Sequence, residues 1–158
     1  MTTDDITALD TGSSRPAELF QLDESTCVAL LGVHHVGRLI IPGDDPYVIP
    51  VNYTVVGGEV VLRTERRPVI DAVIDHPIVF EVDMFDDRSK SGWSVVVRGH
   101  ARDIAVDTDR VGETGTGVAP ESWAPGDRNC VIRISADRLT GRLLRGEVTP
   151  PPDEHGYL

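Results

Sequence analysis

Residues 47–64 have the sequence YVIPVNYTVVGGEVVLRT, which predicts two antiparallel strands joined by a tight turn. Tyr47 to Val56 and Glu59 to Thr64 are rich in β-branched and aromatic residues, which favour strands. Between them, Gly57-Gly58 predicts a two-residue hairpin turn, because glycine tolerates the positive φ angles that such turns need. A mainly β fold is therefore the starting hypothesis.

Further strands are expected on both sides of this hairpin. Asp23 is a good N-cap for a short helix from Glu24 to Gly32. Pro68 suits the first turn of a second helix, which His76-Pro77 ends. The remaining β-rich runs are Val36 to Ile41, Ile78 to Met84, Trp93 to Val106 (with a bulge or bend at Gly99), Val131 to Ser135 and Leu139 to Leu144. Six or so antiparallel strands with two short helices predict a small barrel or sandwich.

The composition limits the partners of this chain. Its 158 residues predict about one domain, and 26 acidic against 15 basic residues give a formal charge of −11. Such a charge repels phosphate backbones and anionic lipids, so we expect no nucleic-acid and no membrane partner. Two cysteines, Cys27 and Cys130, cannot form a disulfide scaffold and suggest reduced, buried thiols. With no signal sequence in view, we expect a cytoplasmic protein.

The ends of the chain differ from its middle. Residues 1–17 contain Thr, Asp, Gly, Ser and Pro with little apolar material, which predicts a flexible N-terminal arm. Residues 146–158 include Pro150-Pro151-Pro152 and predict a loose C-terminal tail. The folded domain is therefore expected over residues 18–145. Residues 107–129 are rich in glycine and proline and predict a loop.

The sharpest candidate site is the stretch Arg63-Thr64-Glu65-Arg66-Arg67-Pro68, where a strand gives way to a helix. Three arginines in five residues stand out in a chain of charge −11. A helix N-terminus, guanidinium groups and the Thr64 hydroxyl together suit one phosphate group. The alternative is a solvated loop whose arginines balance nearby acids.

Two weaker features follow. Pro50 interrupts a strand and suggests an edge or bulge, where Asn52 and Tyr53 could face a ligand. Trp93 could offer a stacking surface and Ser94 a hydrogen-bond donor. The alternatives are an ordinary amphipathic strand and a core tryptophan, respectively. The histidines show no metal-ligand spacing, no serine lies in a nucleophile elbow, and Gly112 to Gly117 lacks the setting of a nucleotide loop, so we expect no metal site.

A series of short motifs in order carries a family resemblance. They are Leu22-Asp23, Cys27 with Leu30-Leu31, Gly37-Arg38-Leu39, Pro50-Val51-Asn52-Tyr53, Arg63-Thr64, Phe80-Glu81-Val82-Asp83, Gly92-Trp93-Ser94-Val95, Trp123-Ala124-Pro125-Gly126-Asp127-Arg128, Val131-Ile132-Arg133-Ile134 and Thr140-Gly141-Arg142. The series resembles the pyridoxamine 5′-phosphate oxidase-like, FMN-binding split-barrel superfamily, and within it the nitroimidazole-resistance-like branch.

The resemblance implies a six-stranded antiparallel split barrel with short helices, and a homodimer with FMN in clefts at its interface. By position, Arg63 and Thr64 would hold the phosphate. Pro50, Val51 and Asn52 would line the isoalloxazine ring, and Trp93 and Ser94 would lie near the phosphate or ring. Trp123 and Arg128 would approach the cleft, from the same chain or the partner. A dimer would also cover the exposed strand edges of a split barrel.

One position departs from the family pattern. Val69 stands where relatives carry a lysine that contacts the phosphate, and Arg66 or Arg67 could supply that charge instead. The first functional hypothesis is an FMN-dependent oxidoreductase of a small-molecule substrate, with the chemistry in the cofactor. The alternatives are the same fold with a deazaflavin or haem, and a cofactor-free binding or regulatory protein.

Overall fold

The computed structural model describes residues 15–104, 119–120, 123–126 and 128–147. Most of the predicted N-terminal arm, C-terminal tail and loop 107–129 lies outside the described residues. In chain order the elements are β1 (Glu18–Leu22), α1 (Glu24–Leu31), β2 (Val36–Ile41), β3 (Tyr47–Val56), β4 (Glu59–Thr64), α2 (Pro68–Asp71), β5 (Pro77–Asp86), β6 (Ser91–Asp103), β7 (Cys130–Ile134) and β8 (Arg138–Arg145). Neither helix is long enough to cross a membrane.

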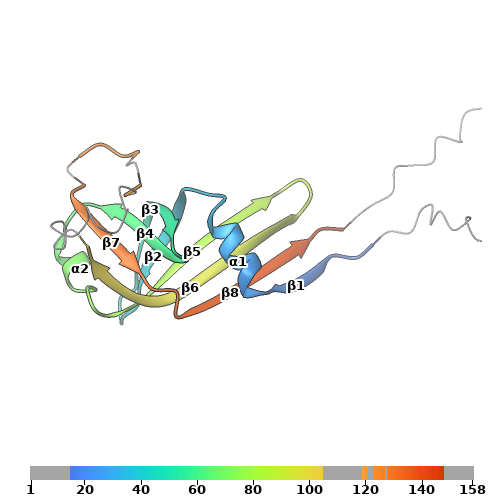
Figure 1. Ribbon diagram of the computed structural model, residues 1–158. Coiled ribbons are helices and arrows are strands. Elements are labelled where there is room, and N and C mark those ends of the chain that lie inside the picture. Colours follow the sequence, from blue (N-terminus) through green and yellow to red (C-terminus); the bar gives the residue numbers. More distant parts are fainter. Residues whose placement is uncertain (1–14, 105–118, 121–122, 127, 148–158) are drawn as a thin grey trace, which may run out of the picture.

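Six of these strands close a barrel. The described sheet has the order β1-β8-β6-β5-β2-β3-β4-β7, and a further pairing between β6 and β7 joins its ends into a ring of β5, β2, β3, β4, β7 and β6. Every pairing between these strands is antiparallel. The predicted six-stranded antiparallel barrel is therefore confirmed. Strands β8 and β1 extend the sheet beyond the ring (Figure 1).

The long strand β6 has two successive partners on the side away from β5. Its first part, Gly92 to Arg98, pairs with β8, and its last part, Ala101 to Asp103, pairs with β7. Between the two parts, the backbone of Ser135 packs directly against Gly99, where a side chain would collide with the Ser135 carbonyl. The register between β6 and β5 runs through Gly99 without a break, so the predicted bulge is absent from that ladder. Gly99 instead provides room for the chain to cross from β7 to β8.

The β3–β4 hairpin has the predicted turn. Gly57 and Gly58 have φ angles of 60° and 83°, as a type I′ turn requires at both central positions. The strands on either side pair from Asn52 opposite Arg63 to Val56 opposite Glu59. This register decides which side chains face outward together.

The core fills the barrel and the space beneath α1. Fully buried side chains include Leu39, Tyr53, Leu62, Phe80 and Ile132. Both cysteines are unpaired and buried, as predicted, and burial raises the pKa of each thiol.

Helix α1 begins as the sequence predicts. The Asp23 carboxylate accepts a hydrogen bond from the Thr26 backbone N–H at 2.8 Å, which satisfies one of the free donors of the first turn. Cys27 and Leu31 face the core, and the Tyr53 hydroxyl donates to the Leu31 carbonyl at 2.6 Å. This bond ties the end of α1 to the barrel.

Two elements differ from the sequence predictions. Strand β1 was not expected, since its sequence ELFQL has no buried face of its own: Leu19 and Phe20 are 61% and 36% exposed. It forms because it pairs along its whole length with β8. Helix α2 is a single turn of four residues rather than a helix reaching His76, since Ile74 instead bridges to Ala101 of β6.

Candidate functional site

Strand alternation divides the predicted site residues between two faces of the barrel wall. Successive side chains of a strand point to opposite faces, so neighbours in sequence are separated. Val51, Thr64 and Trp93 face the interior and are 5%, 4% and 6% exposed. Pro50, Asn52, Arg63 and Ser94 lie on the outer face, where they are exposed or half-buried.

Trp93 belongs to the hydrophobic core. Its indole packs against the His34 ring at 5.4 Å between centroids, with the planes tilted by 38°. This contact lies inside the molecule, as the core-tryptophan alternative describes. The side chains of Val51 and Thr64 are also buried and face away from the outer-face site.

Asn52 and Arg63 form the centre of the outer-face site. They are direct register partners across the β3–β4 ladder, so their side chains start about 5 Å apart on one face. The Arg63 Nε atom is buried and has no hydrogen-bond partner among the described residues. A buried donor without an acceptor costs about 1–3 kcal/mol. This position therefore suits an anionic acceptor supplied by a ligand.

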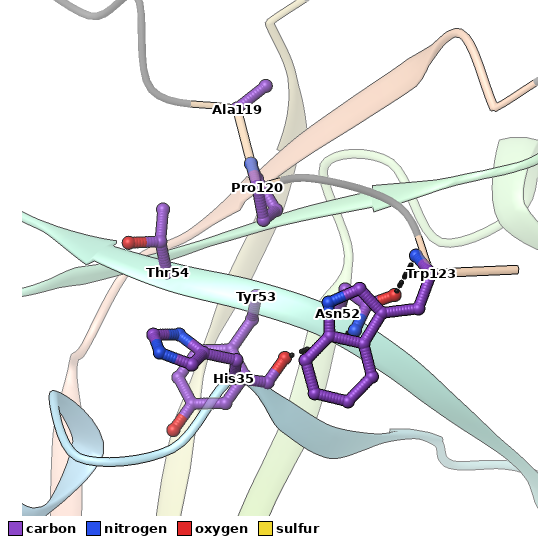
Figure 2. Close-up of a pocket in the computed structure, with 7 residues that line it drawn as sticks. All are labelled: His35, Asn52, Tyr53, Thr54, Ala119, Pro120 and Trp123. Atoms are coloured by element: carbon purple, nitrogen blue, oxygen red, sulfur yellow. Dashed lines mark hydrogen bonds between the residues drawn. The ribbon is translucent and has the colours of Figure 1, made fainter.

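A pocket of about 300 Å³ opens beside Asn52. The Asn52 amide donates to the His35 carbonyl at 3.4 Å, and its oxygen accepts from the Trp123 backbone N–H at 3.0 Å. Figure 2 shows the Trp123 indole beside the Asn52 side chain over β3. That indole is 67% exposed and offers a flat aromatic face to the pocket. The lining, called here the Asn52 pocket, consists of His35, Asn52, Tyr53, Thr54, Ala119, Pro120 and Trp123.

Arg128 is a second arginine with an unused donor near the end of β4. Its Nε atom is buried without a hydrogen-bond partner in the described part of the chain. The pKa of Glu65 lies below its ordinary value, mainly because Arg67 hydrogen-bonds to its carboxylate, with a smaller effect of the Arg128 charge. Cys130 pairs with Thr64 at the end of β4, so Arg128, two residues earlier in the chain, lies just beyond that strand end. Arg63 and Arg128 are the site residues best able to hold a phosphate.

Arg66 and Arg67 are already paired with acids. The Arg66 guanidinium bonds to Asp71 and Asp103, and the Arg67 guanidinium bonds to Glu65 at 2.7 Å. In this conformation both match the alternative of a loop whose arginines balance nearby carboxylates. Their replacement of the missing lysine stays a prediction. Val69 packs against the core and carries no polar group toward the site.

A second, strongly basic pocket lies elsewhere on the outer face and was missed from the sequence. It has a volume of about 540 Å³. We call it the arginine pocket; its lining residues are Gln21, Ser94, Val96, Arg98, Arg138, Thr140 and Arg142. Alternate positions 138, 140 and 142 carry Arg, Thr and Arg, which is a one-face pattern for a strand. The pairing of β8 with β6 that completes the pocket has no local signal in the sequence.

Ser94 therefore lies away from Asn52 and Arg63. Around the closed ring, β6 lies three strand spacings from β3 and two from β4, or about 14 Å and about 10 Å along the barrel wall. The structure brings together Asn52, Arg63 and Trp123, with Arg128 at the adjacent strand end, and places Ser94 with the arginine pocket. Among the described residues, no group of three or more His, Cys, Asp or Glu side chains could hold a metal ion.

Comparisons with known proteins agree with this architecture. An uncharacterized protein of Mycobacterium tuberculosis is 28% identical over 141 residues, which cover 84% of this chain and 91% of that protein. The FAD-binding protein of Mycobacterium smegmatis superposes with a TM-score of 0.61 at 25% identity, covering 81% of this chain and 100% of that one. A conserved protein of unknown function from Corynebacterium diphtheriae superposes with a TM-score of 0.62 at 29% sequence identity. The match covers 78% of this chain and 96% of that one.

The family model described as pyridoxamine 5′-phosphate oxidase matches residues 23–143. This range runs from the N-cap of α1 into β8 and contains all six strands of the closed barrel. The chain therefore belongs to the pyridoxamine 5′-phosphate oxidase family.

Proposed function

We propose that this chain binds FMN at the Asn52 pocket and Arg63, and acts as a flavin-dependent oxidoreductase of a small molecule. The observation that carries the proposal is the buried, unpartnered Nε of Arg63 directly across the ladder from Asn52. A flavin mononucleotide has an aromatic ring system at one end and a phosphate at the other. The site offers an aromatic face, an amide and a guanidinium in adjacent positions.

Each residue has a distinct part in this proposal. The exposed indole of Trp123 provides a stacking surface, and Asn52 fixes the segment that carries it. Arg63 and Arg128 pair with the phosphate through charge-assisted hydrogen bonds. When bound, the flavin supplies the hydride or electron transfer, and the protein supplies binding and orientation. The similarity to a mycobacterial protein described as FAD-binding supports a flavin in general.

A homodimer is part of the proposal. Ile40 pairs with Val48 on one side and Val79 on the other, which makes an apolar row across the outer face of β3, β2 and β5. Val48 is 52% exposed, and a second copy seated on this row would bury it. Light scattering should give twice the chain mass, and Ile40→Glu should give a monomer. Val33→Glu, an exposed position outside the row, is the matched control.

The test of flavin binding is direct. The purified protein should be yellow or become so on addition of FMN, and a fluorescence titration should give a dissociation constant in the micromolar range or below. Riboflavin, which lacks the phosphate, should bind more weakly. A protein that binds neither compound at micromolar concentration contradicts the proposal.

Haem is a second candidate ligand because His35 lines the Asn52 pocket, and an imidazole is a common axial ligand of haem iron. A thermal-shift panel of FMN, FAD, a deazaflavin and haem separates these possibilities. A ligand present at 100 times its dissociation constant stabilises the fold by about 2.7 kcal/mol. If haem raises the melting temperature more than the flavins do, and His35→Ala removes that increase, haem becomes the assigned ligand instead of a flavin.

A further inference from the structure

The arginine pocket collects positive charge on an acidic protein. Arg98 of β6 and Arg138 and Arg142 of β8 line it together with two hydroxyl side chains and one amide. Val96 is the one aliphatic residue of the lining. A pocket with this lining suits a highly charged group and gives no aromatic face for a flavin ring.

In the described part of the chain, none of these three arginines has a carboxylate within ion-pair distance. Within the cluster, Arg98 donates a long hydrogen bond of 3.5 Å to the Thr140 hydroxyl. The nearby acids are engaged elsewhere. Arg38 pairs with both Glu81 and Asp83 of β5, the strand beside β6.

Asp137 is the acid next to Arg138 in sequence, and it is also engaged. Its carboxylate bonds to the His100 ring at 2.8 Å, and this contact is the main reason that the pKa of Asp137 lies below its ordinary value. The acids around the arginine pocket therefore have bonding partners other than the arginines that line it.

All three arginines are exposed, and two of them lie opposite each other in the sheet. Arg98 and Arg138 are direct register partners across the β6–β8 ladder, and like charges directly opposite each other destabilise a sheet. The chain has a formal charge of −11 and 26 acidic residues, yet none of those described forms an ion pair with Arg98 or Arg138. Asp137 lines a neighbouring pocket with both arginines but bonds to His100. A bound anion would relieve the repulsion between the two arginines, because guanidinium groups bind phosphate through two parallel hydrogen bonds.

We propose that the arginine pocket is a second ligand site, separate from the Asn52 pocket, which binds a small molecule through a diphosphate or a pair of phosphate groups. The volume of about 540 Å³ exceeds the needs of a single phosphate and falls within the range of small-molecule sites. Three guanidinium groups match the charge of a diphosphate. Ser94 and Thr140 add hydroxyl donors from the two central strands.

The first experiment uses pyrophosphate and the wild-type protein. Isothermal titration calorimetry should detect binding that weakens as salt increases. The double variant Arg138→Gln/Arg142→Gln should raise the dissociation constant at least tenfold. The matched control is Arg145→Gln, the same change on the same strand, at a side chain that stacks on Phe20 outside the pocket. No binding to the wild type, or equal loss in the control, overturns the proposal.

The second experiment tests whether the site is separate. Pyrophosphate should still bind when FMN is saturating and occupies the phosphate position at Arg63, and Arg138→Gln/Arg142→Gln should remove this remaining binding. Displacement of pyrophosphate by FMN would overturn the separate site. A different outcome would also overturn the proposal. In it, the wild-type protein does not bind pyrophosphate, and light scattering shows that Arg138→Gln/Arg142→Gln dissociates a dimer. The arginines would then contact a second copy of the chain. A panel of inorganic phosphate, pyrophosphate and ADP then distinguishes a free oxyanion from a nucleotide.

Discussion

The side-chain oxygen of Asn52 accepts a hydrogen bond from the backbone N–H of Trp123 at 3.0 Å, across 71 residues of sequence. One short polar side chain thereby fixes the position of the most exposed large aromatic residue described. The same amide donates to His35 on the other side. Asn52 therefore joins the His35 side of the Asn52 pocket to the Trp123 side.

Replacing Asn52 by alanine should weaken flavin binding about tenfold, because loss of one hydrogen bond of this kind is worth about 1 kcal/mol and the indole is released as well. Fluorescence titration with FMN measures the effect. Thr54→Ala is the matched control, since Thr54 lines the same pocket from the same face of β3. Equal losses in both variants would mean that Asn52 does not position Trp123.

Arg63→Gln should reduce FMN affinity by tenfold or more and leave riboflavin affinity nearly unchanged. The reason is that a charge-assisted contact to the phosphate is lost while contacts to the ring remain. Arg145→Gln, which removes an arginine that stacks on Phe20 outside the site, should change neither affinity. A parallel loss of riboflavin binding in Arg63→Gln would show that Arg63 supports the pocket rather than the phosphate.

Tyr53→Phe should lower the free energy of unfolding by about 1–2 kcal/mol at neutral pH, because the buried Leu31 carbonyl loses its 2.6 Å donor. Urea unfolding measures this change. The ring itself is retained, so its edge contact with Phe80 at 4.9 Å survives. An unchanged unfolding midpoint would show that water replaces the hydroxyl at no cost.

The same residue predicts a loss of stability in alkali. Burial raises the pKa of Tyr53 from 10.0 to about 12. Unfolded chains ionise this group first, so its stabilising effect is complete below pH 10 and is lost as the pH rises through about 12. Urea midpoints at increasing alkaline pH should fall more steeply for the wild type than for Tyr53→Phe. Parallel curves would contradict the shifted pKa.

Gly99→Ala should destabilise the protein by about 3 kcal/mol or more, because the new methyl group would collide with the Ser135 backbone rather than with a movable side chain. Thermal unfolding measures the loss. Gly43→Ala is the control, since nothing lies within 4 Å of a Cβ built there. A normal melting temperature for Gly99→Ala would mean that the crossing between β7 and β8 can shift.

Local patterns predicted most of the barrel. Gly57 and Gly58 specify their turn by backbone sterics, and Asp23 caps α1 with its own side chain, so both were predictable from a few residues. Strand β1 was not, because its partner β8 lies more than 100 residues away and supplies its hydrogen bonds. The length of α2 was overestimated because the bridge from Ile74 to Ala101 is a long-range contact.

The site was predictable only in part for the same reason. Asn52 and Arg63 belong to one hairpin, so their shared face follows from the turn and the strand period. The ion pair between Arg66 and Asp103 depends on where β6 ends, and no local pattern reveals it. The arginine pocket likewise needs β8 beside β6. Residue types suggested the right chemistry, but the sheet order decided which residues meet.

The unequal lengths of the strand ladders around the barrel have a consequence for its dynamics. The ring contains two short ladders of three residue pairs each, one between β6 and β7 and one between β2 and β5, whereas β6 and β5 pair from Pro77 to Asp86 without interruption. Opening of the barrel should therefore start at one of these two ladders, where few hydrogen bonds must break together. Amide hydrogens in these two ladders should exchange with solvent deuterium sooner than those in the ladder between β5 and β6. The barrel would then open transiently at one short ladder while its other strand pairings stay intact.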